Sequence, residues 1–305
     1  AGNVQFHEAM PYVFPAGGNE KLKSRPVVVG CGPAGLFCAY FLAEYGYQPV
    51  LLEQGAPVEE RQKDVEEFWK TGVLKPDSNV QFGEGGAGTF SDGKLMTGIK
   101  KDKYSAKVLQ ELAAAGAPEE ILYLAKPHIG TDRLEIVVKN IRKKIESLGG
   151  EVKLECKLTR LIVANKFVHG VTYEHKGESI DLETDTVIMA IGHSARDTVE
   201  MLYNLGVDIM QKPFSVGARI EHPQKLINEA QYGRFANHPK LGAADYKLAC
   251  HGLHERGAYT FCMCPGGSVV AAASEENTVV VNGMSRHARD GANANSALVV
   301  SVLPE

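Results

Sequence analysis

Residues 26–53 have the sequence PVVVGCGPAGLFCAYFLAEYGYQPVLLE, and this stretch decides the fold. Over about twenty residues from Val27 only Glu44 is charged, which leaves a membrane span, a buried hairpin and a cofactor site open. A transmembrane helix needs roughly 20 apolar residues in continuous helix. Glycines and a proline would fall in the first half of such a helix, so a membrane span is a poor fit.

A strand, a turn, a helix and a second strand explain every position of the same stretch. Three valines at 27–29 predict a buried strand, and residues 30–33 predict a tight turn. The helix is expected at 34–45, Gly46 ends it, and residues 50–52 form the next strand. The helical face is supplied by Leu36, Ala39, Tyr40, Leu42 and Ala43.

The turn has the pattern G-x-G-x-x-G, and each glycine has a mechanical task. Gly30 allows the sharp turn, Gly32 lets the backbone approach a pyrophosphate, and Gly35 lets helix and strand pack closely. An acid, Glu53, ends the second strand, where its carboxylate can accept ribose hydroxyls. Together these features predict a dinucleotide site.

The phosphates are expected at the N-terminus of the helix, beside Pro33 and Ala34, on free backbone N–H groups and the positive end of the helix dipole. The acid at the end of the strand disfavours a 2′-phosphate, so NADP is not expected here and FAD and NAD remain. After Gln54 the chain continues to Arg61. That arginine is expected to meet a phosphate or the flavin side of the cofactor, or else to be solvated.

The apolar segment 184–192 ends in small residues. It is similar to the strand with which flavoproteins of the glutathione-reductase-like group bring backbone close to the cofactor. This similarity favours FAD and makes Ala190 and Gly192 the expected contacts, with a plain buried strand as the alternative.

Composition and charge narrow the function classes. The chain has 305 residues, 44% of them apolar and 23% charged, with a net charge of -4, as in an ordinary soluble globular protein. A nucleic-acid partner is not expected, because phosphate binding requires clustered Lys and Arg. The six cysteines form no CxxC pair and no secretory pattern, which favours a reducing, cytoplasmic location. No signal peptide, membrane segment or metal site is predicted, and the sequence does not determine the oligomeric state.

The chain is expected to divide into a lead-in at 1–25, an FAD-binding domain at 26–197 with an excursion at 62–127, and a β-rich α+β substrate-side domain at 198–305. Helices are predicted at 65–70, 106–115 and 131–148. Strands are predicted at 151–155, 158–163, 167–173, 186–191, 214–220, 258–262, 268–273 and 278–282.

A glycine-rich loop at 79–95, NVQFGEGGAGTFSDGKL, contains a second literal G-x-G-x-x-G. No buried strand precedes it and no helix follows it, so it is not a second nucleotide site. Taken with EQGAPVEER, AIGHSARDT and YTFCMCPGG, the loop resembles the bacterial family described as uncharacterised FAD-dependent dehydrogenases.

The resemblance implies an α/β fold with a Rossmann-like FAD-binding domain of the glutathione-reductase type. It places the loop beside the isoalloxazine ring, with Gly88, Thr89 and Lys94 as flavin neighbours and backbone near Leu158 at the adenine. Such proteins usually have a preceding N-terminal domain and a later segment that closes the FAD site. The chain is therefore expected to be the middle of a larger protein, and its flavin would bind weakly or be lost.

A flavin carries out electron transfer itself, while the protein orients and tunes it. Cys262 and Cys264 precede a Pro-Gly-Gly turn and are candidates for a redox or nucleophilic thiol, with a buried strand end and metal binding as the alternatives. His128 stands just before a helix and is a candidate acid or base, with helix-entry packing as the alternative. His193, Arg196 and Asp197 are expected to contact cofactor or an anion, or to start the next helix with a cap.

Three function classes follow. The favoured one is an FAD-dependent oxidoreductase acting on an unidentified small molecule, with NAD(P)H as a transient reductant. The alternatives are a flavin-dependent RNA-modifying enzyme and a non-catalytic flavin-binding module.

Overall fold

The structure is a computed structural model that describes residues 12–304 apart from 16, 19–20, 97–102 and 254–255. Part of the predicted lead-in at 1–25 lies outside the described residues.

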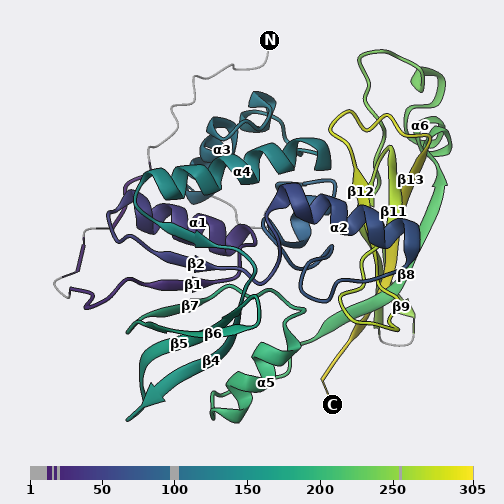
Figure 1. The fold of residues 1–305 in the computed structure, drawn as a ribbon. Coiled ribbons are helices and arrows are strands. Elements are labelled where there is room, and N and C mark those ends of the chain that lie inside the picture. Colours follow the sequence, from purple (N-terminus) through teal and green to yellow (C-terminus); the bar gives the residue numbers. More distant parts are fainter. Residues whose placement is uncertain (1–11, 16, 19–20, 97–102, 254–255, 305) are drawn as a thin grey trace.

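A four-stranded parallel sheet forms the centre of the first half of the chain (Figure 1). Its strand order is β3-β2-β1-β7, and each neighbouring pair runs parallel. The strands are short and lie at β1 (Val27–Val29), β2 (Val50–Leu52), β3 (Glu151–Lys153) and β7 (Val187–Met189). This arrangement confirms the predicted α/β fold with a Rossmann-like first unit.

Helices cover one face of the parallel sheet and a second sheet covers the other (Figure 1). Val28 and Leu51 pack with α1 (Pro33–Glu44) and α4 (Thr131–Ser147). Val27 and Val50 pack instead against the antiparallel sheet of β4 (Cys156–Ala164), β5 (Phe167–His175) and β6 (Glu178–Glu183). Successive side chains on a strand point to opposite faces, so continuous apolar runs are needed to bury both sides.

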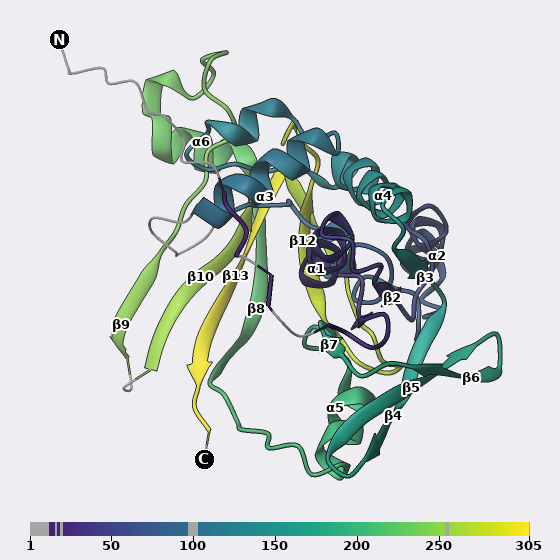
Figure 2. The ribbon, with the colours of Figure 1, turned by 90° about the vertical axis from the view of Figure 1, so that its left-hand side faces the viewer.

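The second half of the chain builds an antiparallel sheet of order β8-β13-β10-β9, which stands beside the first unit (Figure 2). Its strands are β8 (Phe214–Pro223), β9 (Ala249–Leu253), β10 (Arg256–Cys264) and β13 (Asn293–Val302). A hairpin of β11 (Gly267–Ala271) and β12 (Val281–Ser285) lies between this sheet and the first unit, and α6 (Gln224–Tyr232) and η3 (Gly233–Phe235) follow β8.

The remaining helices connect these layers. The first half contains α2 (Val58–Thr71), the short 3₁₀ helix η1 (Gly86–Phe90), α3 (Lys103–Ala114) and η2 (Glu119–Leu122). The link to the second sheet contains α5 (Arg196–Asn204), which spans the predicted boundary at 197. A small core of Val65, Val80, Phe90 and Ala272 joins α2 and η1 to the hairpin.

The sequence missed β6, β9, β13 and α6. In β13, which has the sequence NANSALVVSV, polar and apolar residues do not alternate cleanly, and Asn295 is buried whereas Leu298 is exposed. Pairing with β8 and β10, rather than local pattern, makes this segment a strand. Within the described residues, no helix is long and apolar enough to cross a membrane.

Candidate functional site

A crevice of about 390 Å³ opens where the parallel strands end. It is bordered by the turn after β1, the end of β2, the end of β7 and the start of η1. The lining residues are Gly30, Gly32, Pro33, Ala34, Glu53, Gln81, Phe82, Gly86, Ala87, Gly88, Met189, Ala190, Ile191, Gly192, His193 and Ser194. Ligands of open α/β sheets bind in this position, outside the carboxyl ends of the strands.

Two of the three glycines in the turn are required by packing. Gly30 has a φ of +98°, and a Cβ atom there would lie 2.4 Å from the carbonyl oxygen of Ala190. A Cβ atom on Gly35 would lie 1.7 Å from the carbonyl oxygen of Gly30. Neither contact is sterically allowed, so both positions exclude a side chain.

Gly32 differs from the other two glycines. A Cβ atom there would meet nothing nearer than the Cα atom of Gly86, at 3.9 Å, and Gly32 lines the crevice. A side chain at this position would therefore occupy space in the crevice and not clash with the protein.

The start of α1 is arranged to receive an anion. Gly32 is the N-cap, Pro33 is the first helical residue, and no side chain caps the helix. The first-turn N–H groups of a helix have no acceptor inside it, and the helix dipole places partial positive charge there. Because the lining residues include no Lys or Arg, these backbone groups supply the positive potential for a diphosphate.

Glu53 is 6% exposed and lies at the end of β2, as the sequence predicts. One carboxylate oxygen, Oε2, accepts the N–H of Cys31 at 2.8 Å. The other, Oε1, accepts the N–H groups of Gly55 and Gly83, each at 2.9 Å. Each oxygen has two lone-pair sites, so Oε2 retains one for a ribose hydroxyl. Glu53 therefore also joins the β1 turn to the glycine-rich loop.

The glycine-rich loop forms the second wall of the crevice. Gly86, Ala87 and Gly88 line it, and the N–H of Gly85 donates to the carbonyl oxygen of Cys31 at 2.8 Å. The contact of Gly88 with a flavin stays a prediction that the position of Gly88 in the crevice permits. Thr89 is buried and does not line the crevice.

Lys94 also lies away from the crevice. Its Nζ forms an ion pair with Asp92 at 2.8 Å and donates to the carbonyl oxygen of Met263 in β10. The expectation that Thr89 and Lys94 contact the flavin does not fit these positions, because Thr89 is buried and Lys94 binds Asp92 and the second sheet.

Arg61 is neither solvated nor directed at a ligand. Its side chain is completely buried and does not line the crevice. The guanidinium donates to four carbonyl oxygens of the glycine-rich loop, those of Asn79, Val80, Gly83 and Glu84. Burial lowers the pKa of Arg61 to about 10. Neither predicted role, a solvated side chain or a contact with the cofactor, fits this position. The sequence around Arg61 does not show that residues 79–84 fold around its side chain.

A narrow extension leads from the crevice toward the antiparallel sheet. Gln54 and Leu158 line it together with Cys156 and Thr198. This position is compatible with the predicted contact between Leu158 and an adenine ring.

The end of β7 completes the crevice. Ala190, Gly192 and His193 line it, together with Ser194, which the sequence analysis missed. Neighbouring Arg196 forms an ion pair with Glu275. No side chain caps α5, and Asp197 accepts the N–H of Thr198 at 2.8 Å. The sequence did contain a signal for Ser194, namely a hydroxyl side chain two residues after Gly192, where the small-residue segment ends.

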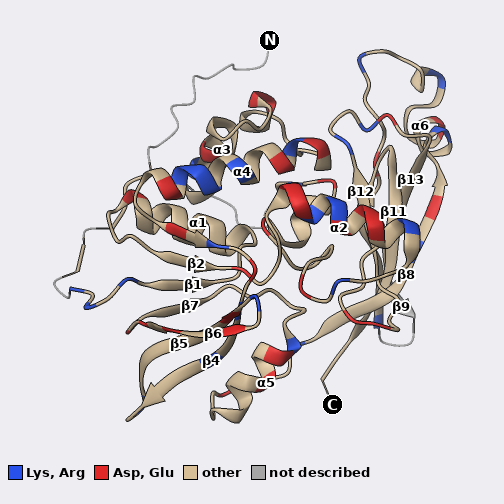
Figure 3. Cartoon of the chain, viewed as in Figure 1, with Lys and Arg blue, Asp and Glu red and all other residues tan. Residues whose placement is uncertain are grey.

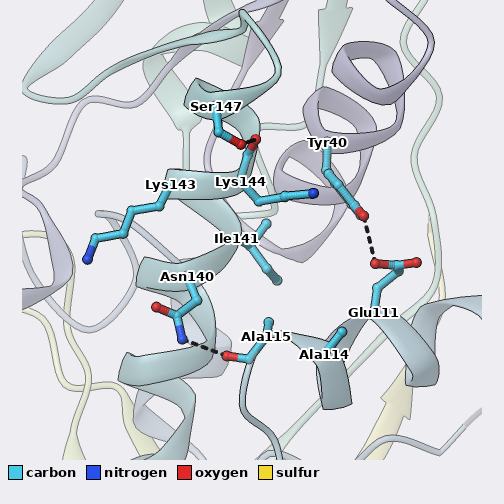
Figure 4. A pocket seen from close by; sticks show the side chains of 9 residues that line it. All are labelled: Tyr40, Glu111, Ala114, Ala115, Asn140, Ile141, Lys143, Lys144 and Ser147. Carbon is cyan, nitrogen blue, oxygen red and sulfur yellow. Dashed lines mark hydrogen bonds between the residues drawn. The ribbon is translucent and has the colours of Figure 1, made fainter.

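A second hollow, of about 500 Å³, lies between α1, α3 and α4 (Figure 4). Its inner polar groups bond to one another: Tyr40 donates to Glu111 at 2.7 Å, and Asn140 donates to the carbonyl oxygen of Ala115 at 2.9 Å. Lys143 extends away from Tyr40 in this view. Although this hollow is larger, it lacks the strand ends and the uncapped helix start, so the crevice is the candidate site.

The two candidate thiols lie in β10, away from the residues that line the crevice. Cys264 is buried and donates to the carbonyl oxygen of Cys262 at 3.3 Å, whereas Cys262 is exposed. Burial raises the pKa of both thiols, which keeps them protonated near neutral pH. The structure therefore offers no support for a reactive thiolate at either position.

His128 packs at the junction of the two halves of the chain. Its ring stacks on that of His287 with centroids 5.1 Å apart, and its Nε2 lies 3.0 Å from the carbonyl oxygen of His287. Residue 128 also forms an isolated β-bridge with Lys94. The helix-entry alternative describes this position better than a catalytic acid or base, because His128 does not line the crevice.

Stability is expected to depend on pH through His128. Burial lowers the pKa of His128 below its ordinary value of 6.5, and the charges of Arg289 and His287 act in the same direction. The folded state therefore favours the neutral ring, and its contribution is complete above pH 6.5 and lost as the pH falls. His128→Gln should flatten the decline in the unfolding midpoint between pH 8 and pH 5.5. The exposed His169→Gln is the matched control, and equal declines in all three proteins would contradict the assignment.

In the part of the chain that the structure describes, no group of three or more His, Cys, Asp or Glu residues is arranged to hold a metal ion.

Comparisons with known proteins also indicate a dinucleotide cofactor. Residues 213–305 match the family described as "FAD-dependent protein, C-terminal domain-like", and residues 28–58 match the "NAD(P)-binding Rossmann-like domain". These matches support FAD as the cofactor. A Clostridium beijerinckii protein described as "Uncharacterized protein" is 54% identical over 304 residues. The match covers 99% of this chain and 56% of the relative, so the chain spans about half the relative's length.

Solved flavoenzyme structures are more distant. The flavin-dependent brominase Bmp2 has 15% identity and a TM-score of 0.44, over 92% of this chain and 56% of that one. The 3-ketosteroid-delta4-(5alpha)-dehydrogenase of Rhodococcus jostii has 12% identity and a TM-score of 0.42, over 77% and 65%. Both TM-scores are below 0.5, so neither likeness says anything about the chemistry of this chain.

Proposed function

We propose that this chain is the FAD-binding part of an FAD-dependent oxidoreductase that acts on a small molecule. The observation that carries the proposal is the crevice at the carboxyl ends of β1, β2 and β7, which combines an uncapped helix start, the open Gly32 and a strand-end carboxylate. Uncharged backbone donors and one acid suit a diphosphate followed by a ribose.

In this proposal, the first turn of α1 binds the diphosphate and Glu53 Oε2 accepts a ribose hydroxyl. The extension beside Leu158 receives the adenine, and Gly86, Ala87 and Gly88 line the part of the crevice that receives the flavin. FAD, when bound, supplies the electron transfer. The proposed fold type is that of glutathione reductase, supported by the packing of the β4-β5-β6 sheet on one face of the parallel sheet. The free cysteines suit the proposed cytoplasmic location.

The first test is the identity of the bound nucleotide. Full-length protein should show a flavin absorption spectrum, and heating should release FAD. Release of NAD, or a protein that neither contains nor takes up FAD, would overturn the proposal.

The second test separates an enzyme from a non-catalytic flavin-binding module. Anaerobic mixing of the full-length holoprotein with NADH or NADPH, followed by screening of small molecules for bleaching of the flavin band, should reveal turnover. A flavin that no donor reduces at a catalytic rate would favour the module.

An RNA-modifying enzyme is disfavoured by the charge distribution. Figure 3 shows acidic and basic residues interspersed along α2 and α4, and the net charge is -4. Nucleic-acid binding usually requires a basic patch or stripe. Salt-sensitive retention of tRNA in a filter-binding assay would revive this alternative.

A further inference from the structure

One cluster of polar residues on the second sheet has no role in the crevice. The register of β8, β13 and β10 places Arg219, Ala297 and Phe261 in one row. Asn295 and Cys264 occupy the next, and a β-bulge inserts an extra residue between Phe261 and Cys264. At the bulge, Cys262 has a φ of +47°, an unusual conformation for a residue other than glycine.

Arg219 in this cluster is a half-buried cation without a carboxylate partner. Its Nη1 donates to the carbonyl oxygen of Cys262 at 3.1 Å and to Oδ1 of Asn295 at 2.7 Å. Among the described residues it forms no ion pair, and its Nε and Nη2 make no hydrogen bond. Arg289 and Arg142, which are comparably shielded, each face a carboxylate. The two unused nitrogens of Arg219 form an edge that matches a carboxylate in bidentate geometry.

Asn295 accepts a hydrogen bond from this guanidinium and orients it. Asn295 is completely buried, and its Nδ2 has no hydrogen-bond partner among the described residues. The amide thus leaves a buried donor unsatisfied while its oxygen orients Arg219. A buried polar group without a partner is costly, and such groups concentrate at functional sites.

A second positive charge, that of Lys94, also acts on Cys262. Lys94 reaches β10 through the carbonyl oxygen of Met263, and both Lys94 and Arg219 lower the pKa of Cys262 against the larger effect of burial, which raises it. Two acids also belong to this region. Asp92 raises the pKa of Cys262 and is shared by Lys94 and Arg289, and Glu221, in register with Asn295, accepts hydrogen bonds from Val269 and Asn293.

The cluster is connected to the crevice by one short helix. The first residues of η1 line the crevice, and its last residue, Phe90, accepts a hydrogen bond from Asn282 in β12 at 3.0 Å. The next residue, Gly283, lies against Arg219, Asn295 and Cys264. A five-residue 3₁₀ helix spans about 10 Å, so η1 and β12 connect the flavin side of the crevice to the cluster around Arg219.

We infer that Arg219 forms an anion-binding site, and that the substrate of the proposed oxidoreductase carries a carboxylate or a similar anionic group that this site holds. Asn295 is a positioning residue that orients Arg219. The substrate class rests on the proposed function, whereas the anion site itself does not require a flavin.

Charged and neutral alkylating reagents test the site at Cys262. Full-length protein is treated in parallel with iodoacetate and iodoacetamide near pH 8.5, the ordinary pKa of a cysteine thiol, and modification at each cysteine is measured by mass spectrometry. The exposed Cys250 is the internal reference. It is in register with Ala258, three residues from Phe261, and so lies on the face of the sheet opposite to Arg219, which shares a row with Phe261.

The iodoacetate-to-iodoacetamide rate ratio is expected to be roughly fivefold higher at Cys262 than at Cys250. Arg219→Gln should bring the ratio at Cys262 down to that at Cys250, and Arg219→Lys should retain part of the preference. Arg160→Gln, which removes one exposed positive charge from β4, is the matched control and should change nothing. The unfolding midpoint of each variant shows whether it is folded.

Equal ratios at the two cysteines in the natural protein would overturn the site, as would an unchanged ratio in a folded Arg219→Gln. Failure of Cys262 to react with either reagent at any pH between 8.5 and 10.5 would contradict the exposure on which the site depends, because its raised pKa slows the reaction at pH 8.5 without preventing it. Because these rates need no flavin, their outcome is separate from that of the FAD and NAD(P)H experiments. A preference at Cys262 in a protein without FAD would retain the anion site and remove only the substrate assignment.

Discussion

Gly32→Asp is expected to abolish FAD binding while the protein remains folded. The aspartate side chain would enter the crevice, since a Cβ atom at Gly32 meets no protein atom nearer than 3.9 Å. There its negative charge would face the position proposed for the diphosphate, at the start of α1. We expect FAD affinity to fall at least about a hundredfold, or roughly 3 kcal/mol. Fluorescence titration of apoprotein with FAD measures the affinity, and thermal unfolding without FAD measures the fold.

Two further variants interpret this result. Gly18→Asp introduces the same charge at an exposed glycine with open space around it and should bind FAD normally. Gly35→Ala should instead unfold the protein, because its Cβ would overlap the carbonyl oxygen of Gly30. Normal FAD affinity in a folded Gly32→Asp variant would place the dinucleotide elsewhere.

Arg61→Gln is expected to destabilise the protein by about 3 kcal/mol or more, or to prevent folding. The substitution removes the partner of four buried carbonyl oxygens in the glycine-rich loop. Arg61→Lys should rescue little, since one ammonium cannot reproduce the planar set of donors. Chemical denaturation of the apoprotein gives the free energy of unfolding.

The matched control is Lys63→Gln, which removes an exposed positive charge from the same helix and should leave stability nearly unchanged. The alternative role of Arg61, a contact with a cofactor phosphate, makes the opposite prediction: normal stability of the apoprotein with weaker FAD binding. That pattern would show that the buried position of Arg61 is wrong.

The sequence predicted the first unit closely because its signals are local. The strands at 27–29 and 50–52 lie where the valine and leucine runs placed them, and the helix between them begins one residue earlier than expected. Gly30 and Gly35 are glycines for the reasons that the motif implies. These features depend on backbone geometry within about thirty residues.

The second half was predicted less well. β13 has no clean alternation, yet it forms the centre of the second sheet through its pairing with β8 and β10. The roles of Lys94 and Arg219 depend on partners more than 40 residues away in the chain, namely Met263, Cys262 and Asn295. No local pattern specifies which distant backbone atom a long cationic side chain will reach.

By itself, the sequence determined a dinucleotide turn between a buried strand and a helix, and an acid at the end of the next strand, because a sharp turn and close packing restrict which residues fit. Only the tertiary structure decided that Arg61 holds the glycine-rich loop, that this loop forms the second wall of the crevice, and that Arg219 lacks a carboxylate partner. The reason is physical: hydrogen bonds and ion pairs join groups that the fold brings together, and their partners are set by packing across the whole chain.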